Sequence, residues 1–304
     1  MGKLPVLLLL VGALTACSVK RTVVDIVGSA ISGDGGTYAS DDDPELIREA
    51  MPFGLKTYES LLEISPEHQA LLLSAARGYT AYAFLLQGEA DRLDAADLGR
   101  ARARRDRARK HYLRGRDYAL RGLAVAHPGF VAALRQDVAA VLVTTDVAEV
   151  PFLYWGGVAW AGALSAVKDD LDLLAELPLA AAMVGRAIEL DEAYEGGAAH
   201  EFFIAYEGGR PGGSAGRARE HYARALELSG GARASVHLTF AEAVAIKQQD
   251  LAEFRDLIGA ALAIDPDRKP ELRLVNTISQ QRARWLESRI PDLFFEASDE
   301  EGAI

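Results

Sequence analysis

Apolar residues recur at helical spacing through almost the whole chain beyond residue 43. One stripe consists of Val236, Phe240, Ala243 and Val244, and a second of Leu251, Phe254, Ile258, Ala261 and Leu262. Such stripes, three or four residues apart, place their side chains on one face of a helix. No segment shows the strict alternation of a half-buried strand. The pattern predicts an all-α protein with one helical domain over residues 44–290.

Helix-start signals mark several of these segments. Asp43 precedes Pro44, and Ser65 precedes Pro66, so each pair predicts an N-cap followed by proline in the first helical turn. The glycine-rich stretch 208–213 is followed by Ser214, a further N-cap candidate. This stretch lacks the lysine of a phosphate-binding loop and follows a helix instead of a strand. We therefore interpret it as a turn between helices.

Several predicted helices end in a similar phrase, which suggests internal repeats. The copies are Leu62-Glu63-Ile64-Ser65-Pro66, Ile188-Glu189-Leu190-Asp191, Leu226-Glu227-Leu228-Ser229 and Leu262-Ala263-Ile264-Asp265-Pro266, with a looser one at Leu123-Ala124-Val125 before His127-Pro128. The last three full copies are spaced close to the period of about 34 residues of tetratricopeptide repeats. Alanines at 187, 225 and 261 would allow paired helices to approach closely. We predict a tetratricopeptide-like array of helical hairpins; the alternative is an irregular bundle with common helix-end chemistry.

The N-terminus carries a short apolar run, Leu4 to Leu14, behind Lys3. Its length is that of a signal-peptide core and is too short to span a membrane as a helix. Leu14-Thr15-Ala16-Cys17 resembles a bacterial lipobox, which predicts a signal peptide over 1–16 and an acylated Cys17. Ser18, in place of aspartate, favours the outer membrane. A cleaved signal without lipid is the alternative.

Between this anchor and the helical domain, residues 17–43 are predicted to form a flexible tether, with a short amphipathic helix possible over 19–31. Gly33, Gly35, Gly36 and the run of aspartates at 41–43 favour a linker. At the other end, residues 291–304 are predicted to be a C-terminal tail.

Composition excludes several functions. The formal net charge of −11 argues against nucleic-acid binding, because phosphate backbones attract a basic surface. Cys17 is the single cysteine, so there is no intrachain disulfide, thiol nucleophile or thiolate metal site. The six histidines show no metal-ligand spacing; His200-Glu201 lacks the second histidine of a zincin helix. No nucleophile and base are paired, so we expect no enzyme, no metal and no cofactor.

Residues 100–116 form a dense basic run on a predicted helix, with arginine at 100, 102, 104, 105, 107, 109, 114 and 116 and lysine at 110. Such a run is commonly a solvated face. The functional alternative is attraction to anionic head groups or to an acidic partner.

Four residues are candidates for contact with a ligand or partner. Tyr154, Trp155 and Trp160 lie beside glycines and could line a groove, although buried packing is an equally good interpretation. Asn276 is polar within an otherwise apolar stripe, so it needs a hydrogen-bond partner if it is buried.

The order of several motifs is similar to that of the T-component family of tripartite ATP-independent periplasmic (TRAP) transporters. The segments are Asp43-Pro44-Glu45-Leu46 to Met51-Pro52-Phe53-Gly54-Leu55-Lys56 with Glu59, Tyr154-Trp155 with Trp160, Gly197-Ala198 with His200, Gly212-Gly213 to Ala218, His221-Tyr222 with Ala225, and Arg273-Leu274, Asn276, Gln280, Arg282-Ala283, Leu286 and Asp292-Leu293-Phe294. Together they cover residues 43–295. The basic run at 100–116 is a departure from the family pattern.

This resemblance implies a helical lipoprotein, trimeric around a central pore, that associates with a periplasmic solute-binding protein and passes a small, apolar ligand. It supplies no catalytic residues. A tetratricopeptide-like lipoprotein scaffold for envelope assembly is the alternative function, because concave helical surfaces bind many kinds of partner.

Overall fold

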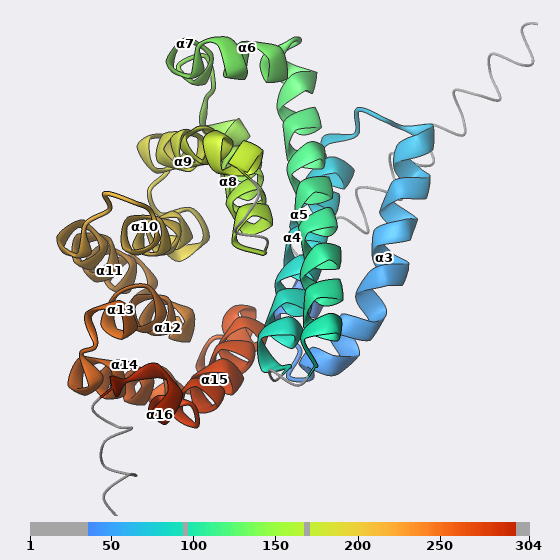
Figure 1. The fold of residues 1–304 in the computed structure, drawn as a ribbon. Coiled ribbons are helices and arrows are strands. Elements are labelled where there is room, and N and C mark those ends of the chain that lie inside the picture. The colour runs from blue at the N-terminus through green and yellow to red at the C-terminus, as the bar shows by residue number, and fades with distance from the viewer. Residues whose placement is uncertain (1–35, 94–96, 167–170, 296–304) are drawn as a thin grey trace, which may run out of the picture.

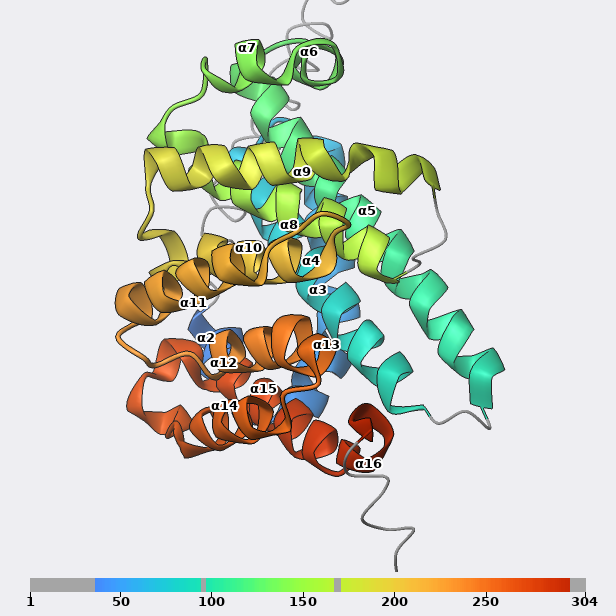
Figure 2. The ribbon, with the colours of Figure 1, turned by 60° about the vertical axis from the view of Figure 1, so that its left-hand side comes forward.

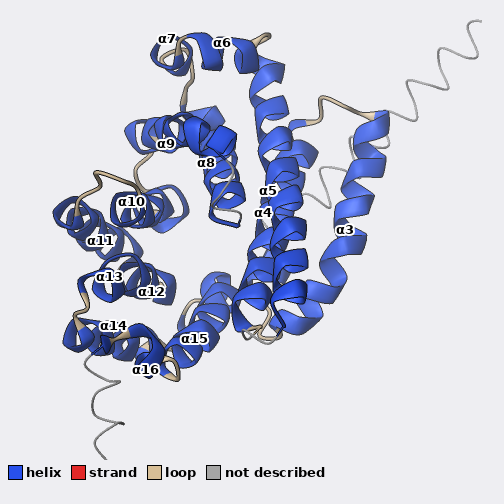
Figure 3. Cartoon of the chain, viewed as in Figure 1, coloured by secondary structure: helices blue, strands red, loops and turns tan. Residues whose placement is uncertain are grey.

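The computed structural model describes residues 36–93, 97–166 and 171–295, and every regular element in these ranges is a helix (Figure 3). The all-α prediction is therefore confirmed for this part of the chain, whereas the tetratricopeptide-like character of the array remains a prediction. The predicted signal peptide, Cys17 and the possible helix at 19–31 lie outside the described residues.

The N-terminal half consists mainly of long helices, drawn from blue through green to yellow in Figure 1. They are α2 (Gly36–Ala39), α3 (Pro44–Ile64), α4 (Gln69–Arg92), α5 (Leu98–Ala126), α6 (Phe130–Gln136), α7 (Val138–Leu142), the 3-10 turn η2 (Val147–Glu149), α8 (Val150–Ala166) and α9 (Leu171–Leu190). α4 packs between α3 and α5, and α8 packs against α4, α5 and α9.

The C-terminal half consists of shorter helices, drawn in yellow to red. They are η3 (Tyr194–Gly196), α10 (Ala198–Gly209), α11 (Ala215–Ser229), α12 (Ala234–Phe240), the π-helical turn η4 (Ala241–Ala245), α13 (Ile246–Gln248), α14 (Leu251–Ala263), η5 (Pro266–Arg268), η6 (Pro270–Leu272), α15 (Arg273–Glu287) and α16 (Ile290–Leu293). Consecutive helices in this half pack side by side.

The row of helices curves back on itself, so that its two ends meet. α15 packs against α2 and α3, which closes the arrangement seen in Figures 1 and 2. The Arg273 guanidinium donates to the Ser40 carbonyl at 2.9 Å across this junction. Residues 36–43, predicted as the end of the tether, thus include α2 and contribute to the folded domain.

Helix ends follow the sequence signals closely. All five predicted end phrases lie at helix C-termini, and Ala187, Ala225 and Ala261 are buried. Asp43 caps α3 by accepting hydrogen bonds from the Glu45 and Leu46 amides, and Ser214 caps α11. The glycine stretch is only partly a turn, because α10 continues through Gly209.

The predicted N-cap at Ser65 is wrong. Ser65 ends α3, and His68 caps α4 instead, with its ring nitrogen accepting from the Leu71 amide at 3.3 Å. Starting α4 at Gln69 places Leu71 and Leu72 fully in the core. The helix α4 therefore begins later than the Ser65-Pro66 signal predicted, and this later start accompanies burial of the two leucines.

Buried apolar side chains form two groups. One spans α3 to α9 and the start of α10, and the other spans α10 to α16, where Phe254 and Phe294 pack with ring centroids 5.0 Å apart. Phe294, predicted to lie in the tail, is thus part of the second group. Two apolar cores explain how one continuous row of helices is stabilised along its length.

Two adjacent glycines on α8 should respond differently to alanine. A Cβ on Gly157 would lie 2.7 Å from the backbone carbonyl of Ala180 on α9, whereas one on Gly156 would meet the flexible end of Met183 at 2.9 Å. We expect Gly157→Ala to destabilise the fold by roughly 1–3 kcal/mol, because α9 would have to shift. Gly156→Ala, whose Cβ would also lie 3.1 Å from the Ala119 Cβ but meets no backbone atom, should cost less. Denaturant unfolding of both variants measures this, and equal effects would contradict it.

Candidate functional site

A cavity of about 730 Å³ lies where the two halves of the row face each other. Its walls come from the N-terminal end of α3, the last two turns of α4, α10, α12, η4 and α15. These elements are far apart in the sequence, so the cavity depends on closure of the row by α15. In size it falls within the range of small-molecule sites.

Apolar side chains cover part of this cavity. Phe84 and Leu85 on α4 face Leu238 on α12 and Ile278 on α15. Phe84 is 55% exposed, although phenylalanine is usually buried. An aromatic ring that remains accessible inside a cavity offers apolar contact to a ligand.

Another part of the cavity wall is polar and is centred on Glu201 of α10. Ser235 and Thr239, one helical turn apart on α12, donate hydroxyl hydrogen bonds to the two Glu201 oxygens at 2.9 and 3.2 Å. Arg233 lies 3.5 Å from the same carboxylate. These contacts fix the position of the carboxylate in the wall.

Glu242 enters the cavity from the π-helical turn η4. π turns inside helices are uncommon and occur frequently at functional sites. The Arg282 guanidinium on α15 contacts Glu242 at 2.7 Å and Asp91 on α4 at 3.2 Å, so it links three elements. Burial raises the pKa of Glu242; Arg282 opposes this change and Asp91 adds to it. Glu242 therefore takes up a proton more readily than an ordinary glutamate.

Comparison with known proteins identifies the family. The family model for the TRAP transporter T-component matches residues 40–294. The chain belongs to this family. A protein of Treponema pallidum (strain Nichols), described only as uncharacterized, is 31% identical over 267 residues, covering 85% of this chain and 83% of the relative. Membership assigns an accessory role in TRAP transport, and the family is not a known enzyme family.

Two of the predicted contact residues of this T-component lie in an aromatic group between α8 and η3. Tyr154 is buried and packs edge-on against Trp155 and Tyr194, with centroids 5.2 and 5.5 Å away. The Trp155 indole donates to the Tyr194 hydroxyl at 3.3 Å, and the Arg77 guanidinium lies over the Trp155 ring. The flanking glycines, 156 and 157, face α5 and α9.

The other two candidates are buried in well-defined hydrogen-bonded positions. Trp160 is 2% exposed; its indole donates to Glu176 at 3.0 Å and Arg116 lies over its ring. Asn276 is 1% exposed and accepts from the Ala234 amide and donates to the Ala232 carbonyl, both at 2.9 Å.

None of the four predicted contact residues is among those lining the cavity. Contact of these four with a ligand or partner stays a prediction of the T-component sequence. Glu201, Glu242 and Arg282 were not predicted as site residues. The one signal in the sequence was Glu242, an acidic residue within the segment 236–244 that carries an apolar stripe.

Many arginines of the basic run are paired within the T-component. Arg104 contacts Glu89, Arg105 contacts Asp91 and Arg114 contacts Glu59. Arg107 donates to the Tyr82 hydroxyl at 2.9 Å, and Arg116 covers Trp160. Much of α5 therefore uses its arginines to bind neighbouring helices, which sequence spacing alone did not reveal.

One histidine in this region gives stability a dependence on pH. His111 stacks on Tyr79, and burial, followed by Arg107 and Arg114, lowers its pKa from 6.5 to about 4. Between pH 6.5 and 4, His111 is protonated in the unfolded chain and neutral in the folded chain. The free energy of unfolding therefore falls as pH decreases through this range. In His111→Gln we expect a shallower fall, measured by urea unfolding across this range. A variant with the wild-type slope would refute the assignment, and His127→Gln serves as control.

No three His, Cys, Asp or Glu side chains are grouped as metal ligands within the described ranges. His200 contacts His221 at 2.9 Å and Glu192 at 3.1 Å, which links α10, α11 and the loop before η3. In the same part of the chain no helix is both long and apolar enough to cross a membrane.

Proposed function

We propose that this chain is the periplasm-facing accessory lipoprotein of a TRAP-type transporter, which binds the solute-binding subunit and passes a small ligand through its cavity. The observation that supports this proposal is the cavity of about 730 Å³ in a chain matched by the T-component model. Its accessible Phe84 offers apolar contact to a ligand, and the carboxylates and arginines that make up much of its wall offer charged and hydrogen-bonding contact.

Gly88 allows the cavity role to be tested without disturbing the core. It lines the cavity, and a Cβ there would meet nothing within 4 Å. We expect Gly88→Trp to fill the cavity and to abolish binding of the neutral apolar probe N-phenyl-1-naphthylamine, measured by fluorescence. Gly259→Trp, at a helical glycine on α14 that also has open space, is the matched control and should bind like wild type.

Association with the solute-binding subunit needs a separate measurement. We expect the tagged chain to retain a TRAP solute-binding protein in pull-down, in both glycine variants. Retention of cell-wall or barrel-assembly proteins instead would favour the alternative, an envelope scaffold. Normal probe binding in Gly88→Trp would reject the cavity role alone.

We further propose that Cys17 carries the membrane anchor and that the domain faces the periplasm, from the outer membrane. The proposal is supported by the lipobox-like sequence at 14–17. Fractionation of cells expressing Cys17→Ala tests it, because two or more acyl chains hold a protein firmly on a bilayer. The variant should move to the soluble fraction; continued acyl labelling in the membrane fraction would place the anchor elsewhere. Assembly as a trimer, implied by the resemblance, is checked by mass measurement in solution.

A further inference from the structure

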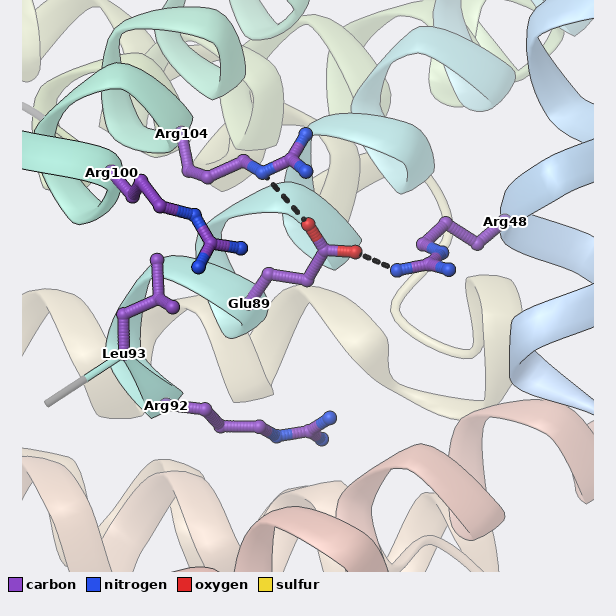
Figure 4. Close-up of a pocket in the computed structure, with 6 residues that line it drawn as sticks. All are labelled: Arg48, Glu89, Arg92, Leu93, Arg100 and Arg104. Atoms are coloured by element: carbon purple, nitrogen blue, oxygen red, sulfur yellow. Dashed lines mark hydrogen bonds and ion pairs between the residues drawn. The ribbon is translucent and has the colours of Figure 1, made fainter. Parts of the chain in front are cut away.

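Four arginines line a second, smaller pocket that adjoins the cavity and shares Arg48, Glu89 and Arg92 with it (Figure 4). Its volume is about 220 Å³, and it is lined by Arg48 on α3, Glu89, Arg92 and Leu93 at the end of α4, and Arg100 and Arg104 at the start of α5. Three separate helices thus bring guanidinium groups to one place in a chain whose net charge is −11.

Glu89 is the one carboxylate in this lining, and it positions two of the arginines. One oxygen contacts Arg48 and the other contacts the Arg104 Nε at 3.2 Å (Figure 4). The Glu89 side chain is 21% exposed. Because each guanidinium carries five N–H donors, Arg104, which contacts Glu89 through Nε, is held in place with its two NH2 groups still available.

Other acidic residues neutralise the group only partly. Arg48 also contacts Glu45 and Glu49, and Arg100 contacts its N-capping neighbour Asp97 at 2.9 Å. The Glu45 and Glu49 side chains are more than 70% exposed. Water screens such surface pairs strongly, so Glu45 and Glu49 weaken the attraction of the arginines for an anion without cancelling it. Arg100 is itself 71% exposed and therefore accessible to an anion from solution.

We propose that this pocket binds a phosphate group, either of a phospholipid headgroup or of free phosphate. A carboxylate has two oxygens in one plane and bridges two arginines, as Glu89 does. Four arginines from three helices surround a space that suits a tetrahedral group with more acceptor oxygens. Arginine recognises phosphate through paired, charge-assisted hydrogen bonds, which gives both affinity and orientation.

Roles within the pocket follow from these contacts. Arg92 and Arg100 bind the phosphate directly, while Arg48 and Arg104 approach it from the side fixed by Glu89. Glu89 competes with the phosphate for the same donors and repels its charge. The site therefore predicts opposite effects for neutralising an arginine and for neutralising Glu89.

Binding of inorganic phosphate to the full chain, measured by calorimetry, tests the site. We expect Arg100→Gln and Arg92→Gln each to weaken binding roughly tenfold, the loss of one charged hydrogen bond. Arg102→Gln is the control: it lies on the same helix, is exposed and does not line the pocket. Glu89→Gln should strengthen binding. Equal losses in Arg100→Gln and Arg102→Gln would show general charge attraction and overturn the proposal.

Vesicles distinguish the two sources of phosphate. In a Cys17→Ser background, co-sedimentation with phosphatidylglycerol vesicles that is lost in Arg100→Gln and retained in Arg102→Gln identifies a headgroup site. Binding of inorganic phosphate without this difference on vesicles identifies free phosphate. Absence of both in the unmodified pocket would overturn the proposal. Arg100 and Arg102 do not line the large cavity, so the comparison of these two variants is independent of probe binding there.

Discussion

Trp160→Ala should lower the free energy of unfolding by about 3–5 kcal/mol, the cost typical of removing a large buried aromatic side chain. Trp160 is 2% exposed and packs in the first of the two apolar cores. Its removal would leave a cavity on α8 and deprive Glu176 of the indole donor at 3.0 Å. Arg116 would also lose the ring that it covers.

Trp155→Ala is the matched comparison, because Trp155 lies on the same helix but is only partly buried. We expect a smaller loss of stability there. Denaturant unfolding of both variants, together with their affinity for the solute-binding subunit, separates packing from contact. If Trp160→Ala kept full stability but lost affinity, Trp160 would be a contact residue.

Asn276→Ala should cost roughly 2–4 kcal/mol, because two buried backbone groups would lose their partner at once. The amide of Ala234 begins α12, and Arg233, the N-cap residue, makes no side-chain cap hydrogen bond. Asn276 on α15 supplies that cap and also binds the Ala232 carbonyl. One side chain therefore joins α15 to the start of α12.

Ser279→Ala provides the control for this effect. Ser279 is also buried on α15, but its hydroxyl donates within the same helix, to Val275. Its removal should cost less than 1 kcal/mol, about one net hydrogen bond or less. Thermal unfolding of the two variants is the measurement. Similar melting temperatures would mean that Asn276 is not the cap that joins these helices.

Sequence reasoning predicted those parts of the fold that depend on neighbouring residues. Helix ends and the caps at Asp43 and Ser214 are short-range, so the residue types were sufficient. At Ser65 the local signal favoured a helix start, but burial of Leu71 and Leu72 accompanied a start at Gln69. The π turn at 241–245 was not predicted, because its apolar residues also fit an ordinary α-helical stripe.

The candidate site was harder to predict, because it forms between residues that are distant in sequence. Glu242, Arg282 and Asp91 come together through closure of the helical row. Periodicity identifies which face of a helix is buried but not which helix lies opposite. The conspicuous residues Trp160 and Asn276 bind Glu176 and the backbone of α12 instead, and none of these groups lines the cavity.

Contact between α15 and the first helices changes how the molecule should respond to truncation. An open row of helical repeats behaves like a linear chain of coupled units, in which the terminal unit can fray without affecting distant ones. Joining the ends removes those free boundaries. Deleting the last helices would expose surface on α2 and α3 as well as on α14. Truncation at the C-terminus should therefore also destabilise the first helices. The C-terminal segment is thus a closing element for the whole molecule and not a dispensable end.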